Sequence, residues 1–380
     1  MQADAQAQLK SRAAGRFFIF REEKRGIFVQ SILKELTALS GACGFEHDVA
    51  RYLAARLKDS ADEIRVDGLG NVIAMKRGGK PGPVLMISAH ADEVGFIVKK
   101  IEKNGLLRFE KIGGHDDRTI LNEGIYVRSQ DGQMHYGIIG SIPCHMMRFD
   151  DPHKVRSYQE MYIDVGAQDA QGVCDMGIRV GDPITWATPY RPFGQNRVVG
   201  HAFDDRAGCA VLVKTLEETD FTNVCGSVYF VFSTQEEVGL RGARIATQQI
   251  HADVGIAVDT TAVSDTFEAM MDNTLVLGAG VGIKVMDHHC ISSVPVRKKL
   301  EKLADEAGIP WQPEVFLGIG TDAGELYAGE GGVPVCTLSI PSRYAHCPHE
   351  VIDLGDLDAC QKLLERFILT LRNKEEFAFI

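Results

Sequence analysis

The 380-residue sequence has no long apolar runs and no excess of basic residues. Runs such as Val84–Ile87 are far too short to span a bilayer. Lysine and arginine together number 41, against 52 aspartate and glutamate residues, which gives a formal net charge of −11. A negative surface repels phosphate backbones and anionic headgroups, so we expect neither nucleic acid nor a membrane as a partner.

The sequence also lacks cysteine pairs at a metal-binding or redox spacing. Its nine cysteines are scattered, odd in number and without a C-x-x-C motif. This usage is typical of reduced thiols and predicts a cytoplasmic protein without a disulfide framework. Residues 1–26 are rich in arginine and lysine but hold no apolar stretch long enough for a signal peptide, so we expect an N-terminal extension there.

The length of the chain by itself favours more than one domain. Two different patterns of apolar residues divide the chain after residue 26. In residues 27–94 and 193–380, apolar runs of strand length alternate with segments of helical periodicity. This pattern predicts an α/β domain with a mixed, largely parallel sheet flanked by helices. Between residues 95 and 192, short β-like runs are separated by Gly, Asn and Asp. We expect this segment to form an inserted β-barrel-like domain with little helix.

Within the predicted α/β domain, the local periodicity of apolar residues predicts individual helices and strands. Helices are predicted over residues 27–39, 46–57, 207–219 and 294–307. A hairpin is predicted over residues 64–75, and buried strands over 84–88, 228–232, 255–258 and 333–340.

The stretch Ser233–Gly239 follows one of these strands and contains two adjacent carboxylates, Glu236 and Glu237. Two anions side by side at the end of a buried strand repel each other and are costly to bury. A bound cation would reverse that cost. A solvated pair at the start of a loop is the alternative that this stretch alone leaves open.

Four further places carry potential metal ligands that we expect at the ends of predicted strands: His90 with Asp92, Asp204 with Asp205, Asp259, and His346. In open α/β sheets, sites form at the carboxyl ends of strands. Two histidines and several carboxylates suit a pair of Zn²⁺, Co²⁺ or Mn²⁺ ions. Each residue alone could instead be a hydrogen-bonded histidine or an aspartate that caps a turn or helix. Their shared position favours a metal centre.

The motifs at these places resemble those of the tetrahedral (TET) aminopeptidase family, which includes glutamyl aminopeptidases and FrvX-like peptidases. The similar segments are AHADEVG at 89–95, AFDDRAG at 202–208, TQEEVG at 234–239, Val258–Asp259 and RYAHCP at 343–348, with weaker similarity at 278–287 and 318–323. The resemblance extends from about residue 27 to the C-terminus. It departs from the commoner family pattern at Cys347, where serine is frequent, and at His349.

The resemblance implies a role for each metal-site residue. Asp204 would bridge two divalent metal ions, with Zn²⁺ or Co²⁺ the expected species. His90 and Asp259 would hold one ion, and Glu237 and His346 the other. The resemblance also implies a cis peptide bond between Asp204 and its neighbour Asp205.

The remaining site residues are implied in the same way. Glu236 would be the general base, and Asp92 would orient His90. The small residues of the segment 318–324, among them Gly320, Thr321 and Asp322, are expected to help line the substrate pocket.

The expected activity is hydrolysis of N-terminal residues from short peptides by a binuclear metal-dependent aminopeptidase. Family members assemble from dimers into dodecamers, so we expect a homo-oligomer in which the insert mediates dimerisation. A metal-dependent deacylase or carboxypeptidase is an alternative, but it needs a basic carboxylate clamp for which no arginine pair is placed. An inactive metal-binding scaffold is a second alternative, and it leaves Glu236 unexplained. A metal-free polysaccharide hydrolase leaves the histidines unexplained.

Overall fold

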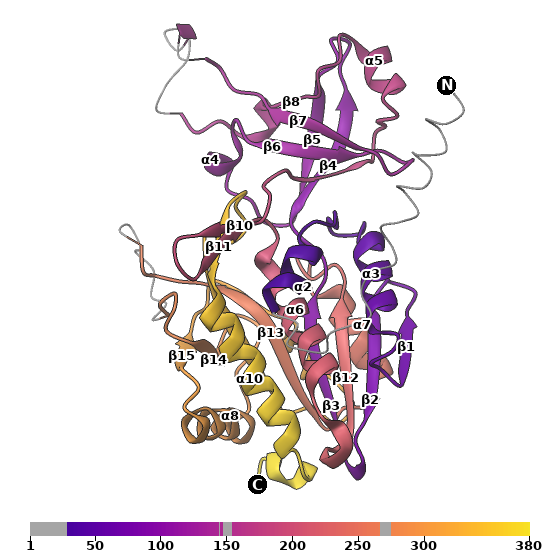
Figure 1. Cartoon of the computed structure of the whole chain (residues 1–380). Helices are drawn as coiled ribbons and strands as arrows, with labels where there is room; N and C mark the ends of the chain where they lie inside the picture. Colours follow the sequence, from indigo (N-terminus) through magenta and orange to yellow (C-terminus); the bar gives the residue numbers. More distant parts are fainter. Residues whose placement is uncertain (1–28, 144, 147–153, 267–274) are drawn as a thin grey trace, which may run out of the picture.

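The structure, a computed structural model, describes residues 29–143, 145–146, 154–266 and 275–380. The predicted extension, residues 1–26, lies outside the described residues. A large α/β domain carries a smaller β-barrel at one end (Figure 1). No helix in the described part of the chain is long and apolar enough to cross a membrane.

The α/β domain is built on a mixed sheet of 11 strands, as the sequence predicts. Its main path runs through β1 (Glu63–Val66), β2 (Val72–Arg77), β12 (Cys225–Ser233), β3 (Lys80–His90), β13 (Val254–Ala262), β16 (Val335–Arg343), β17 (Glu350–Asp353), β11 (Arg197–Gly200) and β10 (Arg191–Phe193). The central strands β12, β3, β13 and β16 are mutually parallel. Strand β14 (Val281–Met286) pairs antiparallel with β16 and parallel with β15 (Trp311–Val315).

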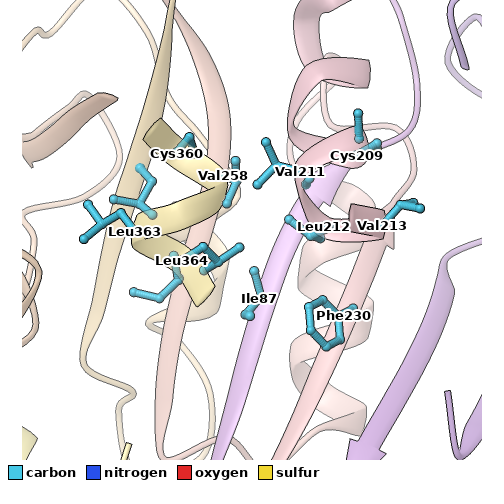
Figure 2. Close-up of a cluster of buried hydrophobic side chains, with 14 of the residues drawn as sticks. Ile87, Cys209, Val211, Leu212, Val213, Phe230, Val258, Cys360, Leu363 and Leu364 are labelled. Carbon is cyan, nitrogen blue, oxygen red and sulfur yellow. The ribbon is translucent and has the colours of Figure 1, made fainter. Parts of the chain in front are cut away.

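Helices cover both faces of this sheet because side chains on a strand alternate between the faces. On β3, Leu85 and Ile87 join the core beneath α2 (Val29–Leu36), α3 (His47–Leu57), α6 (Phe203–Glu218), α8 (Val294–Ala307) and α10 (Leu354–Thr370). Met86, between them, packs on the other face with α7 (Arg241–Gln249) and α9 (Ala323–Leu326). Figure 2 shows the sheet residues Phe230 and Val258 in one cluster with Leu212 of α6 and Leu364 of α10. Short 3₁₀ helices lie at Phe221–Asn223 and near the C-terminus at Lys374–Phe377.

The inserted segment forms a closed six-stranded barrel with its own core. Its strands, in barrel order, are β4 (Gly95–Ile101), β5 (Leu107–Ile112), β8 (Ile163–Asp164), β7 (Met134–Ile139), β6 (Gly124–Arg128) and β9 (Pro183–Trp186). Phe96 meets both Phe109 and Trp186 edge-on, each with ring centroids 5.1 Å apart. β10, which contains the predicted domain boundary at 192/193, already belongs to the large sheet.

The sequence prediction misses two short helices in the insert, α4 (Asp117–Ile120) and α5 (Ala170–Asp175). Neither is long enough to show helical periodicity. Each begins after an aspartate, Asp116 or Asp169, whose side chain accepts a hydrogen bond from a backbone N–H of the first turn. A 3₁₀ helix at Tyr158–Glu160 begins in the same way at Ser157.

Two predicted boundaries near the site are wrong. The strand predicted over 255–258 extends to Ala262, so Asp259 lies within β13 and not beyond it. A polar residue can continue a strand when its backbone is paired, and Asp259 lies opposite Ser339 of β16. The helix predicted from residue 207 begins at Phe203, and Asp204 and Asp205 within its first turn have non-helical backbone angles.

Candidate metal centre

The site lies where the parallel strands end. His90 is the last residue of β3, Glu236 and Glu237 follow β12, and Asp259 lies near the end of β13. Asp204 opens α6, and His346 lies in the loop after β16. The sequence-predicted metal ligands thus come from five separate segments and meet at one edge of the sheet, as expected for an open α/β fold.

The loops that carry these residues hold most of the unusual backbone in the described structure. Six non-glycine residues have positive φ, and five of them flank the site: Ala202, Gln235, Leu240, Tyr344 and His346. The peptide bond between Asp204 and Asp205 is cis, which confirms that prediction. Left-handed backbone at non-glycine residues costs free energy and clusters at functional sites.

The predicted ligands form two compact groups that share Asp204. In the first, Nε2 of His90 lies 3.0 Å from Oδ1 of Asp204 and 3.7 Å from Oδ1 of Asp259. In the second, Nε2 of His346 lies 3.4 Å from Oδ2 of Asp204 and 3.0 Å from Oε1 of Glu237. Within each group, the potential ligand atoms lie within 4.8 Å of one another.

A third group of the same compactness consists of His90, Glu236 and Glu237. Both adjacent glutamates therefore lie within reach of a cation. Distance alone does not separate a ligand from a base at these two positions.

The two histidines present their Nε2 atoms to the carboxylates. Nδ1 of His90 lies 3.2 Å from the carbonyl oxygen of Asp92, and Nδ1 of His346 lies 3.1 Å from that of Gly114. A carbonyl only accepts, so each Nδ1 carries the proton, and Nε2 of a neutral ring has a free lone pair. Lone pairs of histidine and carboxylate then face each other across the site, which is the arrangement that a cation between them satisfies.

The buried acidic groups of the cluster also favour bound cations. Burial alone would raise the pKa of Asp204, but when no metal ion is bound the Nε2–H groups of protonated His346 and His90, whose own pKa values are raised, donate to it and bring its pKa far below the ordinary value. Burial raises the pKa of Glu236 and of Asp259 well above the ordinary range, and His90 offsets this only in part. So many buried acids need protons or metal ions as counter-charges. Oε1 of Glu237 is moreover buried and, among the described residues, has no polar contact other than the one to Nε2 of His346. The donor set of nitrogen and oxygen atoms suits Zn²⁺, Co²⁺ or Mn²⁺.

Asp92 is fully buried and holds the glutamate loop in place. Its Oδ1 accepts from the backbone N–H of Glu236 at 3.0 Å, and its Oδ2 from that of Glu237 at 3.2 Å. The thiol of Cys43 also donates to Oδ2, at 3.0 Å. Burial raises the pKa of this thiol far above its usual value, so it stays a donor. Asp92 therefore orients the adjacent glutamates as well as lying beside His90.

Glu350 is a site residue that the sequence prediction misses. Its buried carboxylate accepts from the backbone N–H of Asp204 at 3.1 Å and from that of His346 at 3.0 Å. It thereby ties together two segments that are far apart in sequence. The available signal was a carboxylate beside the apolar strand residues Val351 and Ile352, only four positions after His346.

The barrel also contributes to the site through the carbonyl of Gly114, which fixes His346. A Cβ at Gly114 would lie 3.3 Å from Nδ1 of His346, a tight contact that would press on the imidazole ring. Cys347 lines the same side of the cavity. His349, the other departure from the family pattern, is exposed and does not line it.

A cavity of about 560 Å³ opens directly over the ligands. Of the three predicted substrate-pocket residues, Gly320 lines it. Thr321 and Asp322 are buried behind the wall. Oγ1 of Thr321 donates to Asp287, while Asp322 accepts from Ser88 and, at 2.6 Å, from Ser233.

The chain is similar to known aminopeptidases over most of its length. Residues 70–363 match the family model for M42 glutamyl aminopeptidases. The lysyl aminopeptidase of Pyrococcus furiosus is 32% identical over 90% of this chain and 97% of its own. An aminopeptidase from the archaeon Desulfurococcus kamchatkensis has a similar solved structure, with a TM-score of 0.87 at 37% identity over 92% of this chain and 96% of that one.

A second solved structure, the TET1 peptidase of Pyrococcus horikoshii, has a TM-score of 0.81 at 28% identity and covers 90% of this chain and 100% of its own. It is described as able to assemble into a tetrahedron or a large octahedral shell. The chain therefore belongs to the M42 glutamyl aminopeptidase family and is a metal-dependent peptidase that acts as an aminopeptidase.

Proposed function

We propose that the enzyme removes single N-terminal residues from short peptides with two divalent metal ions, Zn²⁺ or Co²⁺, bound in each subunit. The observation that carries this proposal is the pair of ligand groups that share Asp204. A bridging carboxylate is what two ions about 3.5–4 Å apart require.

The ligands divide between the two ions according to these groups. Asp204 would contact both ions, because each of its two oxygens faces a different histidine. His90 and Asp259 would help hold one ion, and Glu237 and His346 the other. The hydrogen bonds of Asp92 and Glu350 hold the backbone of Glu237, Asp204 and His346 in position, a support that tunes metal sites generally.

Two such ions, when bound, lower the pKa of a water molecule toward neutrality and polarise the scissile carbonyl. Glu236 lines the cavity and is not required as a ligand in either group that contains Asp204. It takes the proton of the attacking water and returns it to the leaving amine. Asp92 positions Glu236 through the 3.0 Å hydrogen bond to its backbone.

The polarity of the cavity supports recognition of a free N-terminus. Its acidic cluster can receive an α-ammonium or amine. No arginine or lysine is among the described residues that line it. A carboxypeptidase or a deacylase that grips a carboxylate needs such a cation.

We also propose that the protein is a cytoplasmic homo-oligomer, a dodecamer built of dimers. The support is the assembly of the Pyrococcus horikoshii relative and an exposed apolar row on β7. Met134, Tyr136 and Ile138 project from one face of this strand, with 42%, 55% and 43% of their surface exposed. Exposed apolar rows of this kind mark interaction surfaces. The predicted domain boundaries, 95–192 for the insert, are part of this proposal.

The test is a screen of aminoacyl-nitroanilides with chelated enzyme to which Zn²⁺, Co²⁺ or Mn²⁺ is returned. The proposal predicts no cleavage by the chelated enzyme and restored cleavage with at least one ion. Full activity in a preparation shown by elemental analysis to be metal-free would overturn it.

A further inference from the structure

The cavity has two sides that differ in character. On one side, Gly114, His115 and Asp116 of the barrel and Cys347 surround the partly exposed His346. On the other side, the wall continues from Asp259 through the buried Thr260 and Thr261. We call the mostly apolar part of this second side the far wall. It consists of Leu240, His289, Phe316 and Ile319.

The far wall is fixed by glycines of the 318–324 segment. A Cβ on Gly318 would lie 2.5 Å from the Phe316 ring, and one on Gly320 would lie 1.8 Å from the His289 ring. A Cβ on Gly324 would lie 2.5 Å from Cβ of His289. Real Cβ atoms do not approach this closely, so both rings lie directly on backbone that has no side chains. The glycines that line the pocket therefore set the position of its two rings.

The far wall presents no charged side chain among the residues that the structure describes. Three charged residues lie directly behind it and do not line the cavity: Asp287, which accepts from the backbone N–H of His289 at 2.8 Å, and Glu314 and Lys284, which are buried behind Thr261. Oε1 of Glu314 accepts from Oγ1 of Thr261 at 2.5 Å and lies 3.5 Å from Nζ of Lys284. These two charges are turned toward each other. A charged substrate side chain at this wall would lose water without gaining an ionic partner, which disfavours it strongly.

The far wall lies where it could hold the N-terminal residue of the substrate. That residue is the end of a chain and needs only a closed pocket beside the metal ions. The remainder of the peptide needs an open path. The far wall is closed at its base by Thr260, Thr261 and Leu240, which are 3%, 1% and 6% exposed, whereas Phe316 and Ile319 are half-buried and His289 is exposed at its rim. On the His346 side, Gly114 and Asp116 are exposed, and no buried residue among those described closes the base in this way.

We propose that the far wall receives the side chain of the N-terminal residue and selects uncharged apolar side chains of leucine or methionine size, with His289 as the specificity-determining residue. This inference rests on the proposed aminopeptidase activity and goes beyond it, since the names of the family and of a relative refer to glutamyl and lysyl substrates. His289 is the one far-wall residue whose side chain is polar, so its replacement changes the polarity of the pocket without emptying it.

The first experiment compares kcat/KM of the metal-loaded wild type for leucyl-, methionyl-, glutamyl- and lysyl-nitroanilide. We expect the two apolar substrates to exceed both charged ones by at least about tenfold, the discrimination expected of a pocket without a partner for the charge. A preference for glutamyl or lysyl substrate would overturn the assignment. Failure to cleave any of the four with any ion would overturn the proposed function itself.

The second experiment changes the selectivity. His289→Glu should raise kcat/KM for lysyl relative to leucyl substrate by about tenfold or more, and His289→Lys should do the same for glutamyl substrate. Phe316→Ala should lower kcat/KM for leucyl substrate by about tenfold or more, through loss of apolar contact. Leu317→Ala is the matched control, because Leu317 adjoins Phe316 but is 57% exposed and does not line the cavity.

The role of the far wall is judged from the ratios of kcat/KM between the four substrates. A general loss of folded or metal-loaded enzyme lowers all four values by the same factor and leaves these ratios unchanged. Selectivity that moves with the charge at residue 289, while Leu317→Ala keeps the wild-type ratios, supports the proposal. If both His289 variants and Phe316→Ala change kcat/KM for all four substrates by the same factor, the far wall does not receive the N-terminal side chain.

Discussion

Replacement of Glu350 by glutamine tests whether a residue outside the set of metal ligands controls metal binding. The carboxylate accepts one hydrogen bond from the backbone of Asp204 and one from that of His346. Glutamine keeps the size of the side chain but retains only one acceptor oxygen. Its amide group would then point N–H donors at a backbone N–H, so one of the two bonds is lost and a buried donor is left without a partner.

The magnitude follows from the kind of bond that is lost. Burial raises the pKa of Glu350 to about 8, so the measurement is made above that pH, where its carboxylate is charged. A hydrogen bond to a charged group contributes about 1.5–3 kcal/mol, and a buried unsatisfied donor costs a similar amount. Because the two bonded segments carry Asp204 and His346, the loss should appear as weaker metal binding. At 1.4 kcal/mol per factor of ten, we expect the affinity for the more weakly held ion to fall by about 10- to 150-fold.

The assay is competition between the enzyme and a chromophoric chelator for Zn²⁺, with wild type and Glu350→Gln measured side by side. Asp353→Asn is the matched control. Asp353 lies on the same strand and accepts from Asn196 and Gly355, but its hydrogen bonds involve none of the proposed ligands. We expect Asp353→Asn to lose stability and keep wild-type zinc affinity. Equal zinc affinity of wild type and Glu350→Gln, or equal loss in both variants, would refute the reasoning.

Three further outcomes are expected. Glu236→Gln should lower kcat by about 10²–10⁴-fold with nearly unchanged metal content, whereas Glu237→Gln should lose metal; the reverse result in elemental analysis would exchange their roles. Peptides with an acetylated N-terminus should be cleaved poorly, and efficient cleavage of blocked peptides in a chromatographic assay would contradict the N-terminal assignment. Burial raises the pKa of Asp356 to about 6, above its unfolded value near 3.9. The contribution of this group to the free energy of unfolding is therefore fully present below about pH 4, where it is neutral, and is lost as the pH rises through 6. Relative to Asp356→Asn, wild type should therefore lose up to about 3 kcal/mol of unfolding free energy between pH 4 and 7 in urea titrations, and a pH-independent difference would exclude this effect.

The sequence predicted the parts of the site that depend on chain periodicity. His90 and the two glutamates follow apolar runs, and such runs end at the same edge of a parallel sheet. The same reasoning placed Asp259 beyond a strand that in fact contains it, because an apolar run ends at the first polar residue although strand pairing continues.

Other parts of the site depend on contacts that have no pattern in a single sequence. Gly114 acts through its carbonyl oxygen, which every residue has, and reaches His346 from the barrel, 232 positions away. Glu350 acts on backbone N–H groups, one of them 146 positions away. Asp322 belongs to a segment predicted to line the pocket, yet the sequence could not indicate that its side chain faces Ser88 and Ser233 behind the wall.

The central claim is that two ions share Asp204, and metal content per subunit tests it most directly. Elemental analysis of zinc-saturated enzyme, after removal of loosely bound metal, should give two ions per subunit for wild type. Asp204→Asn should lose both ions together, because each oxygen of the carboxylate faces a different ligand group. One ion or none in a fully active wild type, or an Asp204→Asn variant that keeps two ions, would contradict the account.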